Sequence, residues 1–189
     1  MLRLLRIVAL ALPLAALGGL APAQAAPAGA CPATLNHVFG RLQDEAPQSL
    51  CQYRGKVVLV VNTASYCAFT PQYKGLEALY ASYGDRGLVV LGFPSNDFAQ
   101  ETGDNRQITD FCENTYGVKF PMFSKSSVRG PQANPLFKQL AQATGRQPLW
   151  NFHKYLIARD GSVVASYTSL TSPDSSSLLK DIEKQLGAR

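Results

Sequence analysis

The stretch KVVLVVNTASYCAFTPQY (Lys56 to Tyr73) predicts a strand, a turn and a helix in direct succession. Its aliphatic first part indicates a strand over 56–62, which is followed by a thiol at Cys67. Pro71 fits the first turn of a helix, with Thr70 as its cap. Apolar side chains then recur on one face of that helix, at Leu76, Leu79, Tyr80 and Tyr83.

Strand and helix patterns alternate along the rest of the chain, with short connections and no internal repeats. A second aliphatic strand is predicted at 88–93, and an Asp-Gly turn at 160–161 joins two more strands at 152–158 and 162–167. Further helices are predicted around 108–115, over 134–143 and over 175–186. This alternation predicts an α/β protein with one layered core.

The first 25 residues have the pattern of a secretory signal peptide. A short basic leader precedes an apolar run from Ile7 to Leu20, and Ala23-Gln24-Ala25 supplies an A-x-A cleavage pattern. A membrane-spanning helix needs about 20 apolar residues, whereas this run has 14 and is interrupted by Pro13, Gly18 and Gly19. We therefore expect cleavage of residues 1–25, export to the bacterial periplasm, and a single mature domain over 26–189 without stable membrane insertion.

Charge argues against a nucleic-acid partner. The 189-residue chain has a formal net charge of +5, which falls to +3 when the two arginines of the leader are removed. The remaining basic residues are scattered among acidic ones, a pattern typical of a solvated surface.

Four cysteines in an exported chain can form two disulfides. Cys51 and Cys67 flank the first strand, which alone spans roughly 20 Å, whereas bonded cysteines need Cα atoms within about 7 Å. That pairing is therefore disfavoured. The local pair Cys31–Cys51 is the predicted structural disulfide, and a crossed arrangement stays open at this stage.

The position of Cys67 favours a reactive thiol over a small buried side chain. Clefts of α/β sheets open at the carboxyl ends of strands, and a helix N-terminus favours the anionic, nucleophilic thiolate. The sequence reads Cys67-Ala68-Phe69-Thr70, so it lacks the Cys-x-x-Cys of a disulfide oxidoreductase. His37 and His153 stand in no recognisable cysteine-protease signature, and both are expected at the surface or an edge.

Three segments together resemble the glutathione peroxidase family: GKVVLVVNTASYCAFTPQY (55–73), GFPSNDF (92–98) and WNFHKYL (150–156). They occur in order at family-like spacing, and the resemblance extends from about Cys51 to the final helix. It implies a thioredoxin-like fold, with a central mixed sheet flanked by helices, and the reduction of hydroperoxides. It also places Cys67 at the peroxidatic position and Trp150 and Asn151 in a catalytic tetrad. Their N–H groups are hydrogen-bond donors without charge, and no cofactor or metal ion is expected.

One position departs from the family pattern. A Gln usually follows the Asn of the second segment, but here Asn96 is followed by Asp97, the candidate catalytic residue at this place. Ala99 and Gln100 indicate a one-residue shortening just beyond it. Three outcomes stay open: Asp97 is protonated and donates a hydrogen bond, it turns away while Asn96 or backbone amides serve, or the site is impaired.

Cys112, in DFCENTYGVKF, resembles the resolving cysteine of thioredoxin-dependent family members, which forms an internal disulfide with the oxidised peroxidatic cysteine. The alternative is a core residue, on a helical stripe shared with Ile108, Phe111 and Thr115. A resolving role requires local unwinding of the helix, so that the two sulfur atoms can meet.

These features predict a thiol peroxidase that is recycled by a thioredoxin-like reductant on the same side of the membrane. A glutathione-dependent one-cysteine peroxidase and a non-catalytic, peroxide-sensing or redox-binding module are the alternatives. The short segment between Pro121 and Trp150 lacks the insertion that resembles the assembly loop of oligomeric relatives, so we expect a monomer.

Overall fold

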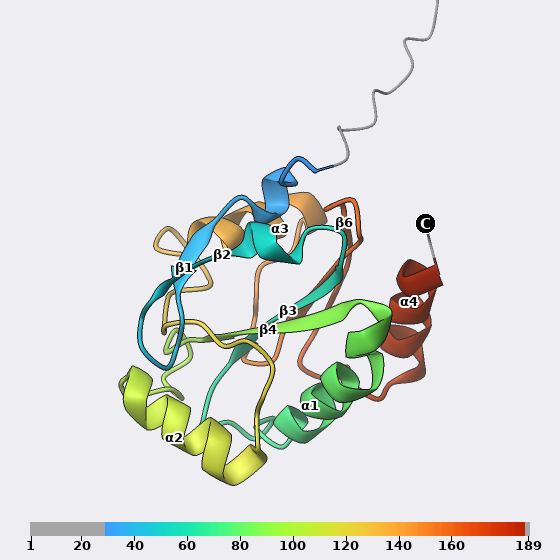
Figure 1. The fold of residues 1–189 in the computed structure, drawn as a ribbon. Helices are drawn as coiled ribbons and strands as arrows, with labels where there is room; N and C mark the ends of the chain where they lie inside the picture. The colour runs from blue at the N-terminus through green and yellow to red at the C-terminus, as the bar shows by residue number, and fades with distance from the viewer. Residues whose placement is uncertain (1–28, 188–189) are drawn as a thin grey trace, which may run out of the picture. The chain divides into compact units, whose positions relative to one another are not determined.

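A mixed sheet in the strand order β4-β3-β5-β6 organises residues 29–187, the part of the chain that this computed structural model describes (Figure 1). Strand β3 (Val57–Thr63) runs parallel to β4 (Leu88–Pro94) and antiparallel to β5 (Lys154–Ile157), which pairs in turn with β6 (Val163–Tyr167). Every residue of β3 and β4 is buried, because helices or loops cover both faces of the sheet. The predicted mixed sheet is confirmed. The predicted signal peptide over 1–25 lies outside the described residues.

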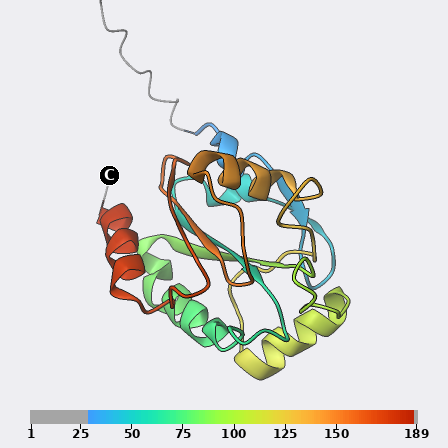
Figure 2. The same ribbon diagram turned by 180° about the vertical axis from the view of Figure 1, so that it is seen from behind.

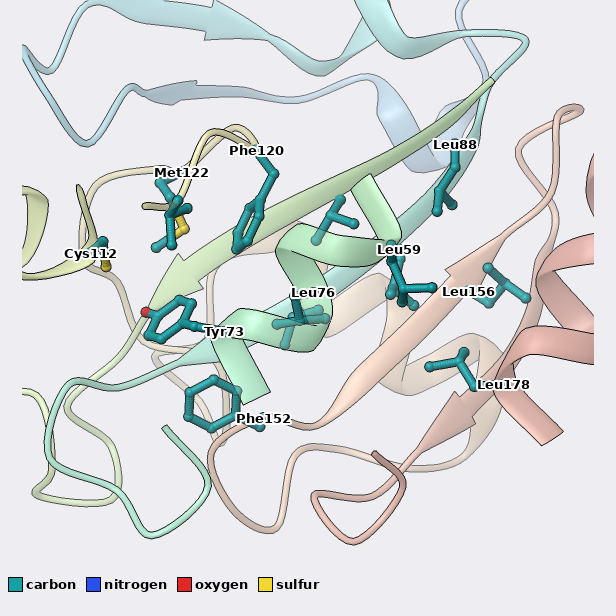
Figure 3. Packing of buried hydrophobic residues seen from close by; sticks show 14 of the residues in the cluster. Leu59, Tyr73, Leu76, Leu88, Cys112, Phe120, Met122, Phe152, Leu156 and Leu178 are labelled. Atoms are coloured by element: carbon teal, nitrogen blue, oxygen red, sulfur yellow. The ribbon is translucent and has the colours of Figure 1, made fainter. Parts of the chain in front are cut away.

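Successive side chains of β3 point to opposite faces of the sheet, so they pack in two separate hydrophobic clusters. Leu59 packs in the first cluster with helices α1 (Gln72–Tyr83), α2 (Asn105–Tyr116) and α4 (Ser176–Gly187), as Figure 3 shows in part. Val60 packs in the second cluster with α3 (Pro135–Thr144) and two short 3₁₀ helices, η1 (Ala33–Leu35) and η2 (Leu50–Tyr53). Figures 1 and 2 show α1 and α4 on one side of the sheet and α3 on the other.

The predicted hairpin near the C-terminus is confirmed, but its first strand is shorter than predicted. Gly161 has φ +86° in the turn, a conformation that glycine adopts readily. Strand β5 begins at Lys154 instead of residue 152, because Phe152 has φ +62°, outside the extended region.

The helices start and stop close to their predicted bounds, with one correction. Helix α1 begins at Gln72 after Pro71 and has no side-chain cap, so the prediction that Thr70 caps it is wrong. Helix α1 continues into the 3₁₀ helix η3 (Gly84–Arg86). Helix α2 opens with a capping box between Asp104 and Gln107 and buries Ile108 and Cys112, whereas Thr115 of the predicted stripe is exposed.

The N-terminal part adds a small hairpin that the sequence patterns did not predict. Strands β1 (Val38–Gly40) and β2 (Pro47–Ser49) pair antiparallel, and the Cys31–Cys51 disulfide closes the segment with Cα atoms 5.3 Å apart. The predicted structural disulfide is confirmed. Cys31 packs against the second cluster, whereas the free thiols Cys67 and Cys112 lie in the first. Within residues 29–187, no helix is long and apolar enough to cross a membrane.

Candidate active site

Cys67 lies in a tight turn between β3 and α1 and is 7% exposed. Its carbonyl accepts a hydrogen bond from Thr70 N at 3.0 Å, and its own N–H donates to Thr70 Oγ1, also at 3.0 Å. The Thr70 hydroxyl donates in turn to Ala64 O at 2.9 Å. Thr70 therefore braces the turn that carries the thiol instead of capping the helix. Phe69 N–H donates to Cys67 Sγ at 3.4 Å, a contact that stabilises negative charge on sulfur.

Three loops meet at the end of the sheet where this turn begins. Thr63 ends β3 opposite Pro94 of β4, and Ser95 N donates to Thr63 O at 3.0 Å, so the loop after β4 starts beside the thiol loop. The loop before β5 arrives at the same end because Phe152 N donates to Asn62 O at 2.7 Å. This is the edge at which α/β sheets form their sites.

Trp150 and Asn151 stand in the loop before β5, and they differ in exposure. Trp150 is 41% exposed, and its ring centroid lies 5.3 Å from that of Phe98. Asn151 is fully buried, with its carbonyl accepting from Ser169 Oγ at 2.6 Å and its Nδ2 donating to Gln100 Oε1 at 2.9 Å. Its Oδ1 has no partner among the described residues. Gln100 thus holds the Asn151 side chain through Nδ2, while Oδ1 has no hydrogen bond to the described residues.

The carboxyl group of Asp97 is hydrogen-bonded to residues 127–129, about thirty positions further along the chain. It accepts hydrogen bonds from Ser127 Oγ at 2.6 Å, Val128 N at 2.6 Å and Arg129 N at 3.1 Å. All three contacts come from residues 127–129, so the carboxyl group is turned toward that segment. Asp97 therefore anchors the 127–129 segment with both of its oxygen atoms.

Glu101 is a buried carboxyl group in the same loop as Asp97. It is 0% exposed, and burial raises its pKa. Ser65 Oγ donates to Oε2 at 3.0 Å, while Oε1 has no partner among the described residues. Because Ser65 stands two residues before Cys67, Glu101 ties the loop after β4 to the thiol loop.

Lys154 is a buried amine at the start of β5. It is 0% exposed, and its Nζ donates to Gln72 Oε1 at 2.6 Å and to Phe152 O at 2.7 Å. No carboxylate lies within ion-pair distance of it in residues 29–187. Burial lowers its pKa from 10.5 to about 7. The ammonium links the first turn of α1 to the loop that carries Asn151.

Cys112 is 2% exposed on the buried face of α2. Burial raises its pKa to about 11, so the thiol stays protonated at neutral pH. Figure 3 shows the hydroxyl end of Tyr73, on α1, directed toward Cys112. Cys67 and Cys112 belong to the same hydrophobic cluster but to separate elements.

An apolar hollow of about 270 Å³ opens beside Trp150. Exposed Leu149 and Leu170 form part of its walls, at 70% and 83% exposure. Phe69, whose N–H contacts the Cys67 sulfur, lines it as well, so one lining residue is in direct contact with Cys67. The complete lining consists of Phe69, Leu149, Trp150, His153, Thr168, Ser169 and Leu170.

Comparison with known proteins places this arrangement in a family. The glutathione peroxidase family profile matches residues 38–141. The hydroperoxy fatty acid reductase gpx1 of Synechocystis is 50% identical over 154 residues, which cover 76% of this chain and 90% of that protein. The chain belongs to the glutathione peroxidase family. The glutathione peroxidase-like peroxiredoxin gpx1 of Schizosaccharomyces pombe is 46% identical over 76% of this chain and 93% of its own length.

Solved structures agree with this membership. The apo form of Trgpx is 35% identical with a TM-score of 0.64, covering 81% of this glutathione peroxidase family chain and 95% of its own. A thioredoxin family thiol:disulfide interchange protein from Chlorobium tepidum has a TM-score of 0.61 at 14% identity, over 80% of this chain and 93% of its own. That second similarity concerns the fold alone, and it confirms the predicted thioredoxin-like fold.

Sequence reasoning missed several residues that build the site of this family member. His153, expected at the surface or an edge, is 3% exposed directly before β5, and burial lowers its pKa to about 4. The sequence patterns do not predict a role for Lys154, although a lysine directly before the apolar residues Tyr155, Leu156 and Ile157 is a visible signal. The bond between Gln100 and Asn151 joins residues 51 positions apart and leaves no local pattern.

Proposed function

We propose that this glutathione peroxidase family member is a thiol peroxidase that reduces hydroperoxides at Cys67. The observation that carries the proposal is the position of Cys67, in a braced turn where its sulfur receives the Phe69 N–H. The loop that carries Trp150 and Asn151 reaches the same end of the sheet. Membership of the family supports the reaction class.

The first step breaks the O–O bond of the peroxide. The Cys67 thiolate attacks the terminal oxygen, its sulfur is oxidised to a sulfenic acid, and the second oxygen leaves as an alkoxide or hydroxide that takes up a proton. Hydrogen-bond donors that stabilise the leaving oxygen lower the barrier. We assign this role to the N–H groups of Trp150 and Asn151, and we assign Asp97 to holding the neighbouring loop.

The second step regenerates the thiol through Cys112. The Cys112 thiol condenses with the sulfenic acid, which forms a Cys67–Cys112 disulfide and releases water; a reductant dithiol then reduces that disulfide by thiol exchange. Because the buried Cys112 stays protonated with a pKa of about 11, α2 must open locally before this thiol can react. We propose a thioredoxin-like reductant, and the peroxiredoxin names of the Chlamydomonas reinhardtii and Schizosaccharomyces pombe relatives support it.

The apolar hollow suits a peroxide with a hydrocarbon chain. Leu149 and Leu170 supply exposed apolar surface next to Trp150, at which a chain can be removed from water. Two relatives from Synechocystis carry the name hydroperoxy fatty acid reductase, in agreement with such a substrate. We further propose an exported, periplasmic and monomeric protein, on the basis of the signal pattern and of the short segment between Pro121 and Trp150.

Two variants test the proposed cycle. Cys67→Ser should abolish peroxide consumption while leaving the circular dichroism spectrum unchanged, since the nucleophile is lost and the fold is not. Cys112→Ser should consume one equivalent of peroxide per chain and then stop, with thioredoxin-supported turnover lost. Stopped-flow consumption and mass spectrometry of the cysteines measure both. Peroxide reduction by Cys67→Ser would refute the role of Cys67. Fast turnover of Cys112→Ser with glutathione would favour the one-cysteine alternative, and an inactive wild type would favour a non-catalytic module.

A further inference from the structure

Gln100 is bonded to two of the three loops that meet at the site. Its carbonyl accepts a hydrogen bond at 3.1 Å from the N–H of Tyr66, the residue directly before Cys67. Its side-chain Oε1 accepts the Asn151 Nδ2 hydrogen bond at 2.9 Å. One residue thus connects the thiol turn with the buried amide.

Backbone strain surrounds both members of this amide pair. Among the described residues, three non-glycine residues have a positive φ, and two of them are Ala99 at +55° and Phe152 at +62°. Ala99 directly precedes Gln100, and Phe152 directly follows Asn151. Such conformations cost free energy and persist where surrounding contacts enforce them, often at functional sites.

The other candidate in this loop is already occupied. Both oxygen atoms of Asp97 accept hydrogen bonds from the 127–129 segment. Asn96 is exposed, and its Oδ1 accepts the Glu101 N–H at 3.0 Å. In this loop, the Gln100 side chain is therefore the one that is hydrogen-bonded to Asn151. Its Nε2 makes no hydrogen bond to the described residues.

We propose that Gln100 is a positioning residue of the peroxide site. Its side chain holds the Asn151 amide in one orientation while its backbone holds Tyr66, so the thiol turn and the amide keep a fixed relation during the attack on peroxide. Ala99, directly before Gln100, lies in the left-handed region of backbone conformation. The proposal rests on the proposed function, because it assigns a role within that reaction.

A double-mutant cycle tests the proposal. The rate constant for oxidation of Cys67 by hydrogen peroxide is measured by stopped flow for the wild type, Gln100→Met, Asn151→Ala and the double variant. Loss of one hydrogen bond to a group in the site should lower the rate constant by about tenfold in Gln100→Met. If Gln100 acts through Asn151, the same change in the Asn151→Ala background should alter the rate by less than about twofold.

Two further variants separate positioning from loss of structure. Gln139→Met is a matched control that removes the side-chain contact of Gln139 with His37, and it should keep the wild-type rate. Gln100→Glu keeps an acceptor oxygen for the Asn151 N–H, so the plateau of its rate–pH profile should return to within about threefold of wild type.

Three results would overturn the proposal: a Gln100→Met rate within about twofold of wild type, an equal decrease in both backgrounds, or a Gln100→Glu plateau as low as that of Gln100→Met. A wild type that reduces no peroxide would instead refute the proposed function itself, so the two failures are distinguishable.

Discussion

Burial of the Lys154 ammonium should make the free energy of unfolding rise between neutral and alkaline pH. Its pKa falls from 10.5 in the unfolded chain to about 7 in the folded protein, because burial disfavours the charged form. Between these values the unfolded chain binds the additional proton, so the free energy of unfolding rises with pH. The unfavourable contribution of Lys154 is complete below pH 7 and disappears as pH approaches 10.5.

A change from pH 6.5 to pH 8.5 gives the clearest test, because this interval contains the folded-state pKa of Lys154, about 7, and stays below its ordinary value of 10.5. Linkage gives a gain of about 2 kcal/mol for Lys154 across it. For a domain of this size, that corresponds to a rise in Tm of roughly 4 to 8 °C. Lys154→Met retains the apolar stem and lacks the titrating group, so its stability should rise less than that of the wild type by this amount.

Urea unfolding at both pH values measures how much the free energy of unfolding changes between pH 6.5 and pH 8.5 in each protein. Lys154→Met also leaves the oxygen acceptors of Gln72 and Phe152 without their partner, which lowers its stability at every pH. The comparison therefore uses the change with pH and not the absolute value. Lys74→Met, which removes an exposed lysine of α1, is the control, and its free energy of unfolding should change with pH as that of the wild type does. An identical pH dependence in Lys154→Met and wild type would refute the argument.

Two further predictions concern the braces of the fold. Replacing Cys31 and Cys51 by Ser opens a loop with a sequence separation of 20 and should lower the free energy of unfolding by about 3 kcal/mol, measured by urea unfolding under oxidising conditions; equal midpoints would contradict it. Thr70→Val removes the hydroxyl that binds Cys67 N and Ala64 O, so it should cost about 1–3 kcal/mol of stability and slow Cys67 oxidation severalfold in stopped flow. An unchanged oxidation rate in a destabilised protein would show that Thr70 does not position the thiol.

The sequence predicted the elements whose patterns are local. An aliphatic run between turn residues specifies β3, and the apolar stripe on one face specifies α1. The Cys31–Cys51 pair followed from strand length and loop length, which are also local quantities. The position of Cys67 between strand and helix followed from the same reading.

The interior contacts of the site could not be predicted in this way. Thr70 before a proline is a common helix cap, and only the tightness of the turn at Cys67 diverts its hydroxyl to that turn. Phe152 has a left-handed backbone, against the preference of its residue type, and its N–H donates to Asn62 O of the neighbouring β3. Gln100 reaches Asn151 because two loops converge at one sheet edge, and convergence depends on the assembled topology.

The sheet keeps the two kinds of sulfur chemistry in this molecule apart. The Cys31–Cys51 disulfide lies against the second hydrophobic cluster, and both free thiols lie in the first, with the strands between them. A thiolate must approach a disulfide directly to exchange with it. In the folded protein, the thiols of Cys67 and Cys112 on one face therefore do not reach the disulfide on the other. Before the strands assemble, no sheet separates the four cysteines, so oxidation at that stage can join the wrong pairs.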